Sequence, residues 1–165
     1  MMYHVGDRVA YPMHGAGVIE AIERREILGK TAAYYVLHFT LTGMKVMIPV
    51  DSPMDNGLRA VIGLEQLEQL WAYLAQAPDP EDGNWNRRYR NNLERIKTGD
   101  LFEVADVVRT LMRRDRDKGL STGERKMLLS ARQILLSEIM LVTGELPEQV
   151  DDQLERTVFP GEAAG

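Results

Sequence analysis

The chain has 165 residues, of which 44% are hydrophobic, so it can bury a core in one ordinary domain or in two small ones. Because it contains no cysteine, disulfide bonds, thiolate metal sites and cysteine nucleophiles are excluded, and a reducing compartment is expected. We find neither a secretory signal nor an apolar stretch of about 20 residues, so we expect a cytoplasmic protein with no membrane contact.

Charge is distributed unevenly along the chain, although the net charge is −5. Residues 84–132 hold 13 Lys or Arg and 7 Asp or Glu, a local balance of +6, whereas the other residues hold 7 basic and 18 acidic side chains. This asymmetry favours one module that meets a polyanion and another with a different role. A helical bundle with Arg-rich solvated faces explains the same numbers, so charge alone leaves both interpretations open.

The first part of the chain alternates short β-branched and aromatic runs with turn residues, which predicts strands. Four strands are expected, at residues 8–11, 17–25, 32–40 and 45–50. Because the loops between them are short, neighbouring strands must pair antiparallel. Strands this short, in a segment of about 50 residues, indicate a small, strongly bent sheet or SH3-like barrel without room for an enclosed active site.

From residue 63 onward the hydrophobic period lengthens from 2 to 3.6, which predicts helices. They are expected at residues 63–77, 86–97, 100–118, 121–142 and 147–157, with Asp100 and Ser121 as N-caps and Pro147 at a first helical position. Residues 77–83 form a loop rich in proline and aspartate. The predicted fold is therefore α+β, with a small β-barrel in residues 1–62 and an all-α domain in residues 63–165.

Sequence signals for enzymatic or cofactor chemistry are weak. His4, His14 and His38 have no metal-ligand spacing and no cysteine to complete a site. Gly29-Lys30-Thr31 joins two strands instead of opening a helix, so it is not a phosphate-binding loop. We therefore expect no metal, no cofactor and no catalysis; a helical-domain enzyme would need a pocket of converging carboxylates.

The segment from Asn84 to Arg90 is the most distinctive feature of the helical part. It places the Trp85 indole at a helix entrance beside Arg87, Arg88 and Arg90. Guanidiniums at these positions can contact successive phosphates, while a flat side chain ahead of the helix can project into a minor groove. The alternative is that Trp85 packs back onto its own helix as a hydrophobic staple.

Further basic residues follow on the next two predicted helices. Arg109, Arg113 and Arg116 fall on one stripe of the helix at 100–118, and Arg125 and Lys126 lie at the start of the long helix. Some of them should face the same side as Trp85 if a DNA-binding patch exists. Ordinary solvated surface charge is the alternative for most of them.

With these residues in view, the chain resembles the CarD and CdnL family of bacterial RNA polymerase-binding regulators over nearly its whole length. The resemblance rests on five separated motifs: Val5-Gly6-Asp7-x-Val9-x-Tyr11-Pro12-x-His14-Gly15, Asn84-Trp85-x-Arg87-Arg88-Tyr89, Gly99-Asp100, Leu120-Ser121-x-Gly123-Glu124-Arg125-Lys126-Met127-Leu128 and Ala131-Arg132. The first resembles the start of a Tudor-like polymerase-interacting domain, which is also found in transcription-repair coupling factors. The other four resemble the family's C-terminal domain.

The resemblance implies that the N-terminal barrel binds the RNA polymerase β subunit. Val36, Met47 and Pro49 fall at positions that the family uses for this contact, and Arg25 matches a contact position of some members. Met47 departs from the branch of the family that carries arginine there, which favours apolar packing over charge. Residues 45–49 also read as an exposed edge strand that can pair with a strand of a partner, although Met47 could instead be a core methionine.

For the C-terminal domain, the resemblance implies binding of promoter DNA without sequence-specific readout. Trp85 would act as a wedge at the upstream edge of the transcription bubble, with Arg87, Arg88, Arg90 and Arg125 on nearby phosphates and Lys126 beside them. Such a monomeric regulator would stabilise the open complex. The alternative from another class is a protein–protein adaptor whose basic patch is incidental.

Overall fold

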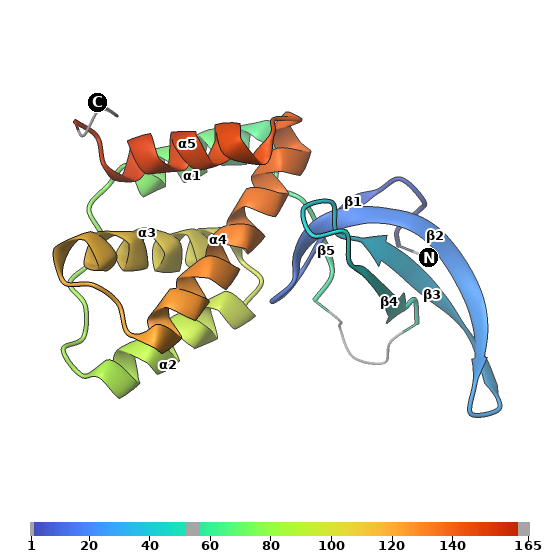
Figure 1. Cartoon of the computed structure of the whole chain (residues 1–165). Helices are drawn as coiled ribbons and strands as arrows, with labels where there is room; N and C mark the ends of the chain where they lie inside the picture. The colour runs from blue at the N-terminus through green and yellow to red at the C-terminus, as the bar shows by residue number, and fades with distance from the viewer. Residues whose placement is uncertain (1, 52–56, 162–165) are drawn as a thin grey trace.

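The computed structural model describes residues 2–51 and 57–161. In these residues five strands form one antiparallel sheet in the order β4-β3-β2-β1-β5, and five helices follow (Figure 1). The strands are β1 Arg8–Tyr11, β2 Gly15–Ile27, β3 Lys30–His38, β4 Lys45–Pro49 and β5 Arg59–Ala60. The helices are α1 Leu64–Leu74, α2 Trp85–Lys97, α3 Leu101–Asp117, α4 Thr122–Thr143 and α5 Pro147–Val158.

The predicted α+β class is confirmed, and so are the four predicted strands. β2 and β3 are longer than expected at their shared turn because Leu28 and Gly29 both adopt positive φ values of 53° and 78°, which closes a two-residue hairpin. β2 curves strongly (Figure 1) and contains an irregularity between Ile19 and Ala21. Sequence reasoning missed β5, whose two residues pair with β1.

The helix predictions are confirmed, and their local signals are visible in the structure. The side chains of Asn84, Asp100 and Ser121 accept hydrogen bonds from backbone N–H groups of the first turns of α2, α3 and α4. Gly144 ends α4 in the left-handed conformation, with φ 75°. One boundary is corrected: α2 begins at Trp85, because Asn84 is its cap, so the indole lies in the first helical turn and not ahead of it.

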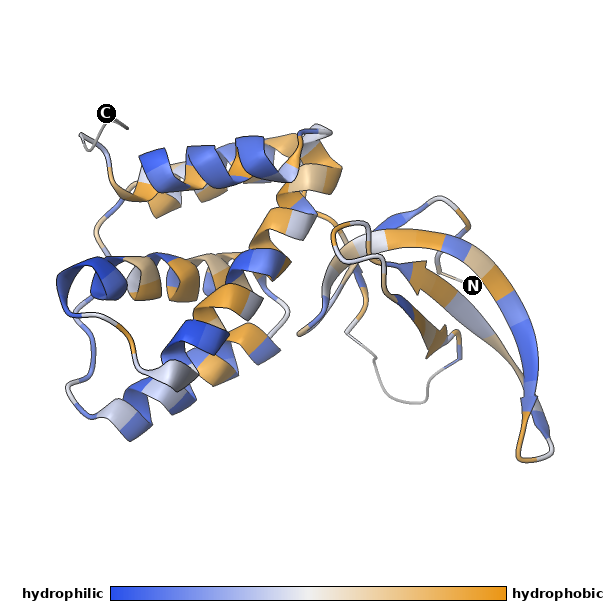
Figure 2. Cartoon of the chain, in the orientation of Figure 1, coloured by the Kyte–Doolittle hydropathy of each residue, from blue (hydrophilic) through white to orange (hydrophobic). Residues whose placement is uncertain are grey.

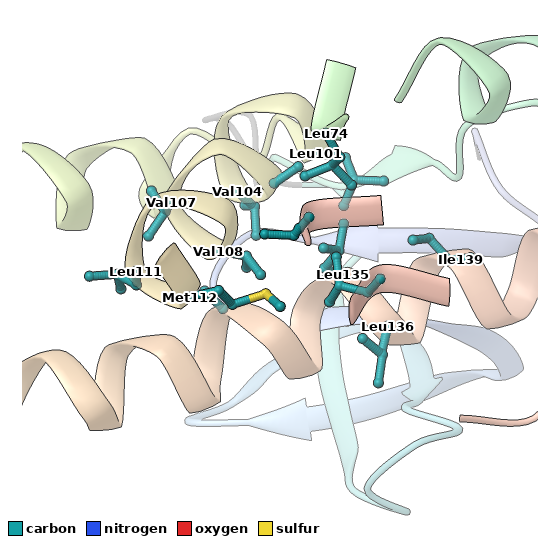
Figure 3. Packing of buried hydrophobic residues seen from close by; sticks show 14 of the residues in the cluster. Leu74, Leu101, Val104, Val107, Val108, Leu111, Met112, Leu135, Leu136 and Ile139 are labelled. Atoms are coloured by element: carbon teal, nitrogen blue, oxygen red, sulfur yellow. The ribbon is translucent and has the colours of Figure 1, made fainter. Parts of the chain in front are cut away.

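Buried hydrophobic residues form two clusters, one in the sheet and one among the helices. The sheet cluster is centred on Val9, Ile19, Leu37 and Ile48. The larger cluster lies between α3 and α4 and includes Leu74 of α1 (Figure 3). α2 is almost entirely hydrophilic along its length, whereas α3 and α4 carry long hydrophobic stretches (Figure 2). The helical cluster therefore depends on α3 and α4, and α2 lies at its margin.

Within the described residues, no single helix is long and apolar enough to cross a membrane. α4 and α5 reach that length and composition only when taken together, and the chain bends by 113° between them.

Candidate functional site

Trp85 is the exposed aromatic residue at the point where the first turns of α2 and α4 meet. Its ring stacks on Tyr89, with centroids 5.0 Å apart and planes at 17°, and 42% of the residue remains exposed. Its Nε1 donates to Ser121 Oγ at 3.2 Å and to Glu124 Oε1 at 3.3 Å. Gly123 leaves room for both rings, since a Cβ there would lie 3.3 Å from Tyr89 and 3.8 Å from Trp85. The indole thus packs on its own helix and is still presented at the surface.

Glu124 is a buried carboxylate beneath this indole, with 2% of the residue exposed. Besides Trp85, it accepts hydrogen bonds from Ser121 and from Arg88 Nε, the latter at 3.2 Å. Burial alone would raise the pKa of Glu124, but the hydrogen bonds from Arg88 and Ser121 and the positive charge of Arg88 hold that pKa below its ordinary value. The carboxylate is therefore ionised at neutral pH and links α2 to α4.

Arg88 was expected among the phosphate contacts, and the structure places it inside this network. Only 6% of the residue is exposed; its Nε pairs with Glu124, and its Nη1 donates to the backbone carbonyl of Asp82 at 3.2 Å. A phosphate would have to break the buried pair to bind this guanidinium. In this arrangement Arg88 supports the carboxylate that holds the indole.

The other cations predicted for this site, on α2 and α4, are exposed. Arg87 pairs with Asp82 at 3.3 Å while most of its side chain remains in solvent. Arg90 is exposed on α2, and Arg125 and Lys126 are exposed in the first turns of α4, where Arg125 Nε donates to the carbonyl of Leu120. All four lie in the first two turns of α2 and α4, the helices whose starts the bond between Trp85 and Ser121 joins.

Of the basic stripe expected on α3, Arg109 is buried and Arg113 is half-buried, whereas Arg116 is exposed. Arg109 is buried and donates to two backbone carbonyls near the C-terminal end of α1. Arg113 donates to the carbonyl of Val158 at the end of α5, and the guanidinium of Arg116 lies 3.6 Å from the ring centroid of Phe159. Arg109 and Arg113 thus satisfy helix ends and pack between helices, which their spacing alone did not reveal.

The four residues predicted to contact the polymerase lie on one face of the sheet. Register pairs Val36 with Met47, and side chains two residues apart along a strand share a face, which adds Arg25 of β2 and Pro49 of β4. Val36 is largely buried in the middle of the sheet, whereas Met47 is 38% exposed and so is not a core methionine. Arg25 pairs with Glu23 at 2.9 Å.

β4 forms one edge of the sheet, as expected. The N–H of Val50 donates to the carbonyl of Ala33, and the N–H of Phe39 donates to the carbonyl of Met44. These bonds show which residues of β4 direct their backbone groups toward β3, because such residues alternate along a strand. By that alternation the backbone groups of Lys45 and Met47 point away from β3 toward the open edge. The strand therefore has the geometry needed to add a partner strand.

Sequence reasoning missed the residues that position the indole. The Ser-x-x-Glu signal correctly indicated a capping box at Ser121 and Glu124, and that box is present. Nothing in the spacing indicated that the same carboxylate also reaches Trp85 and Arg88, which lie 39 and 36 residues away along the chain. Tyr89 entered only as part of a motif, without a role.

Comparison with known proteins adds three findings. A family model described as the CarD-like/TRCF RID domain matches residues 3–62, and a model described as CarD, C-terminal domain, matches residues 69–155. Over 149 residues the chain is 38% identical to a Bacillus subtilis (strain 168) protein named "Putative transcription factor YdeB". That alignment covers 90% of this chain and 97% of the relative.

Proposed function

The chain belongs to the CarD family of transcription regulators that act with RNA polymerase, and from this premise we propose that it holds the polymerase and promoter DNA at the same time. The sheet binds the polymerase β subunit, and the helical domain binds DNA at the upstream edge of the transcription bubble. The protein stabilises the open complex without catalysing a reaction and without a cofactor. It works in the cytoplasm as a monomer.

The observation that carries the DNA part of this proposal is the fixed, half-exposed indole of Trp85. Its stacking on Tyr89 and its bonds to Ser121 and Glu124 restrict the ring before any DNA arrives. A side chain that is already ordered loses less conformational entropy on binding. Inserted between base steps, such a ring offsets part of the unstacking cost at the bubble edge, which is a few kcal/mol per step. Bubble collapse is therefore slower.

Exposed cations in the first two turns of α2 and α4 supply the phosphate contacts. We assign this role to Arg87, Arg90, Arg125 and Lys126, all exposed in the first two turns of the two helices that meet at Trp85. Arg88, which is buried against Glu124, supports the indole instead of contacting a phosphate. A few phosphate contacts give weak binding that is independent of sequence, so the free protein needs the polymerase to raise its local concentration at the promoter.

The polymerase contact uses the edge and the outer face of the sheet. The outward backbone groups of Lys45 and Met47 pair with a strand of the β subunit, and the side chains of Met47 and Pro49 pack against it. Arg25 and Val36 extend the contact across β2 and β3. Val36 is largely buried, so it contributes mainly by packing beside its paired residue Met47. Residues 1–62 and 63–165 are thus two modules with separate partners.

The competing function is an adaptor that binds two proteins and no DNA. Fluorescence anisotropy of labelled forked promoter DNA, alone and with polymerase, distinguishes the two functions. We expect weak binding of the free protein, strong binding with polymerase, and weaker binding of the Trp85→Ala variant. Leu64→Ala, which truncates an exposed leucine on α1, is the matched control and should behave like wild type. If the DNA has the same anisotropy with polymerase and this protein together as with polymerase alone, the result would favour the adaptor.

A further inference from the structure

The sheet and the helical domain meet along the second half of α4 (Figure 1). The 22-residue helix starts beside α2, where Glu124 and Ser121 hold the indole, and it later packs against β2. One helix therefore contacts both the proposed DNA site and the sheet that carries the proposed polymerase edge.

One contact between the two parts is an ion pair of a buried carboxylate with a partly exposed guanidinium. Glu138 of α4, 1% exposed, accepts a bidentate pair of hydrogen bonds from Arg59 of β5 at 2.7 and 2.8 Å. It also accepts the backbone N–H of Ile62 at 2.9 Å, and Arg59 Nε donates to the carbonyl of Gly99 at 2.9 Å. Bidentate geometry fixes the direction of both side chains as well as their distance. The charges of Arg59 and Glu138 are therefore paired in only one arrangement of the sheet and the helical domain.

A second contact involves Ser137, the residue before Glu138 on α4, and the backbone at the start of β2. Ser137 Oγ accepts the N–H of Ala16 at 2.9 Å. The neighbouring Gly15, with φ 99°, lies so close that a Cβ there would be 2.6 Å from Ser137 Oγ. Only glycine satisfies both the conformation and the contact. The start of β2 is thus fitted closely to α4.

A third contact involves the turn after β1. Pro12 packs against Gly99, the residue before the N-cap of α3, and a Cβ on Gly99 would lie 2.9 Å from Pro12 Cγ. Arg8 also donates to the backbone carbonyl of Leu141 near the end of α4. The sheet is therefore held at several points on the helical domain, and a rotation about one of them would break the others.

We propose that α4 is a rigid strut between the two binding sites and that Arg59 and Glu138 are the positioning residues that fix the sheet to it. This inference rests on the proposed function. Glu124 and Glu138 are 14 residues apart on α4, which corresponds to about 21 Å along a helix. When β4 is bound to the polymerase, the strut places Trp85 at one distance from it. A flexible connection would spread the indole over many positions and lower its effective concentration at the bubble edge.

An interdomain distance measurement tests the strut directly. Because the chain has no cysteine, Lys30→Cys and Lys118→Cys give two exposed spin-label positions, one on the sheet and one at the end of α3. We expect one narrow distance distribution for this doubly labelled chain. Glu138→Gln keeps the shape and the acceptor for Ile62 but removes the charge, so the distribution should broaden. Arg132→Gln, which breaks pairs between α4 and α5, is the matched control and should leave it narrow.

Promoter kinetics then separate this inference from the proposed function. Glu138→Gln should keep wild-type affinity for the isolated β-subunit lobe and for forked DNA, yet shorten the open-complex lifetime about threefold to tenfold through lost effective concentration. A broad distribution without the Glu138→Gln substitution would overturn the strut. A distribution that stays narrow in Glu138→Gln, or a lifetime that stays at the wild-type value while Trp85→Ala shortens it, would overturn the positioning role of Arg59 and Glu138; each of these results leaves the proposed function standing. An unchanged lifetime in Trp85→Ala would instead remove the wedge, and the distance measurement would still decide whether the two parts are rigidly joined.

Discussion

Replacing Glu124 with alanine tests whether one buried carboxylate holds the indole site together. The variant leaves the guanidinium of Arg88 buried without its ionic partner, which typically costs about 3–5 kcal/mol. The retained bond from Arg88 to the carbonyl of Asp82 favours the lower end of that range. Loss of the Glu124 half of the capping box with Ser121 adds up to about 1 kcal/mol. We expect a total destabilisation of about 3–4 kcal/mol.

A loss of this size is measurable without unfolding the chain, because domains of this kind are stable by about 5–15 kcal/mol. Urea denaturation followed by circular dichroism gives the change in free energy of unfolding, and the midpoint of thermal unfolding should fall by roughly 6–16 °C. Glu94→Ala is the matched control: this α2 glutamate is exposed and faces Lys97, so its removal should change stability by no more than about 0.5 kcal/mol. A Glu124→Ala variant as stable as Glu94→Ala would refute the network.

Three further predictions concern pH, the polymerase edge and the phosphate contacts. The folded pKa of Glu124 lies below its ordinary value of 4.5, so the stability that this carboxylate contributes is present above pH 4.5 and is lost as pH falls through the folded pKa. Urea titrations should therefore show that wild type loses more stability than Glu124→Gln on acidification below pH 4.5. Equal losses for the two proteins would contradict this. Met47→Glu should weaken binding to the isolated β-subunit lobe about tenfold, since a carboxylate must be desolvated in an apolar contact, and an unchanged pull-down would remove this edge from the interface. Lys126→Ala should reduce the slope of log affinity for forked DNA against log salt concentration by about 0.9, and an unchanged slope would show that Lys126 contacts no phosphate.

Much of the fold could be predicted because its signals are local. Strand periodicity, turn glycines and the caps at Asp100 and Ser121 each depend on a few consecutive residues, and the structure contains each of them. β5 could not be predicted in this way. It consists of two residues whose strand character comes only from pairing with Val9 and Ala10, about 50 residues earlier in the chain.

The exposed part of the candidate site could be predicted, and its support could not. Trp85 stands out in the sequence because three arginines follow it closely. Whether each guanidinium faces solvent depends on its partners in the folded chain, which can lie far away in the sequence. Arg88 is buried because Glu124, 36 residues away, neutralises it. Arg109 is buried because Asp106 of the same helix pairs with it and carbonyls at the end of α1 accept hydrogen bonds from its Nη1. Charge counts treat these arginines as equal to the exposed Arg90, so they overestimate the basic surface.

The lifetime of open complexes at a promoter tests the central claim most directly. Complexes formed with polymerase and this protein are challenged with a competitor, and the decay of melted DNA is followed for wild type, Trp85→Ala and the Leu64→Ala control. The account predicts that Trp85→Ala still binds the polymerase and that its complexes decay faster than those with wild type or Leu64→Ala. Equal lifetimes for all three, with polymerase binding intact, would contradict it.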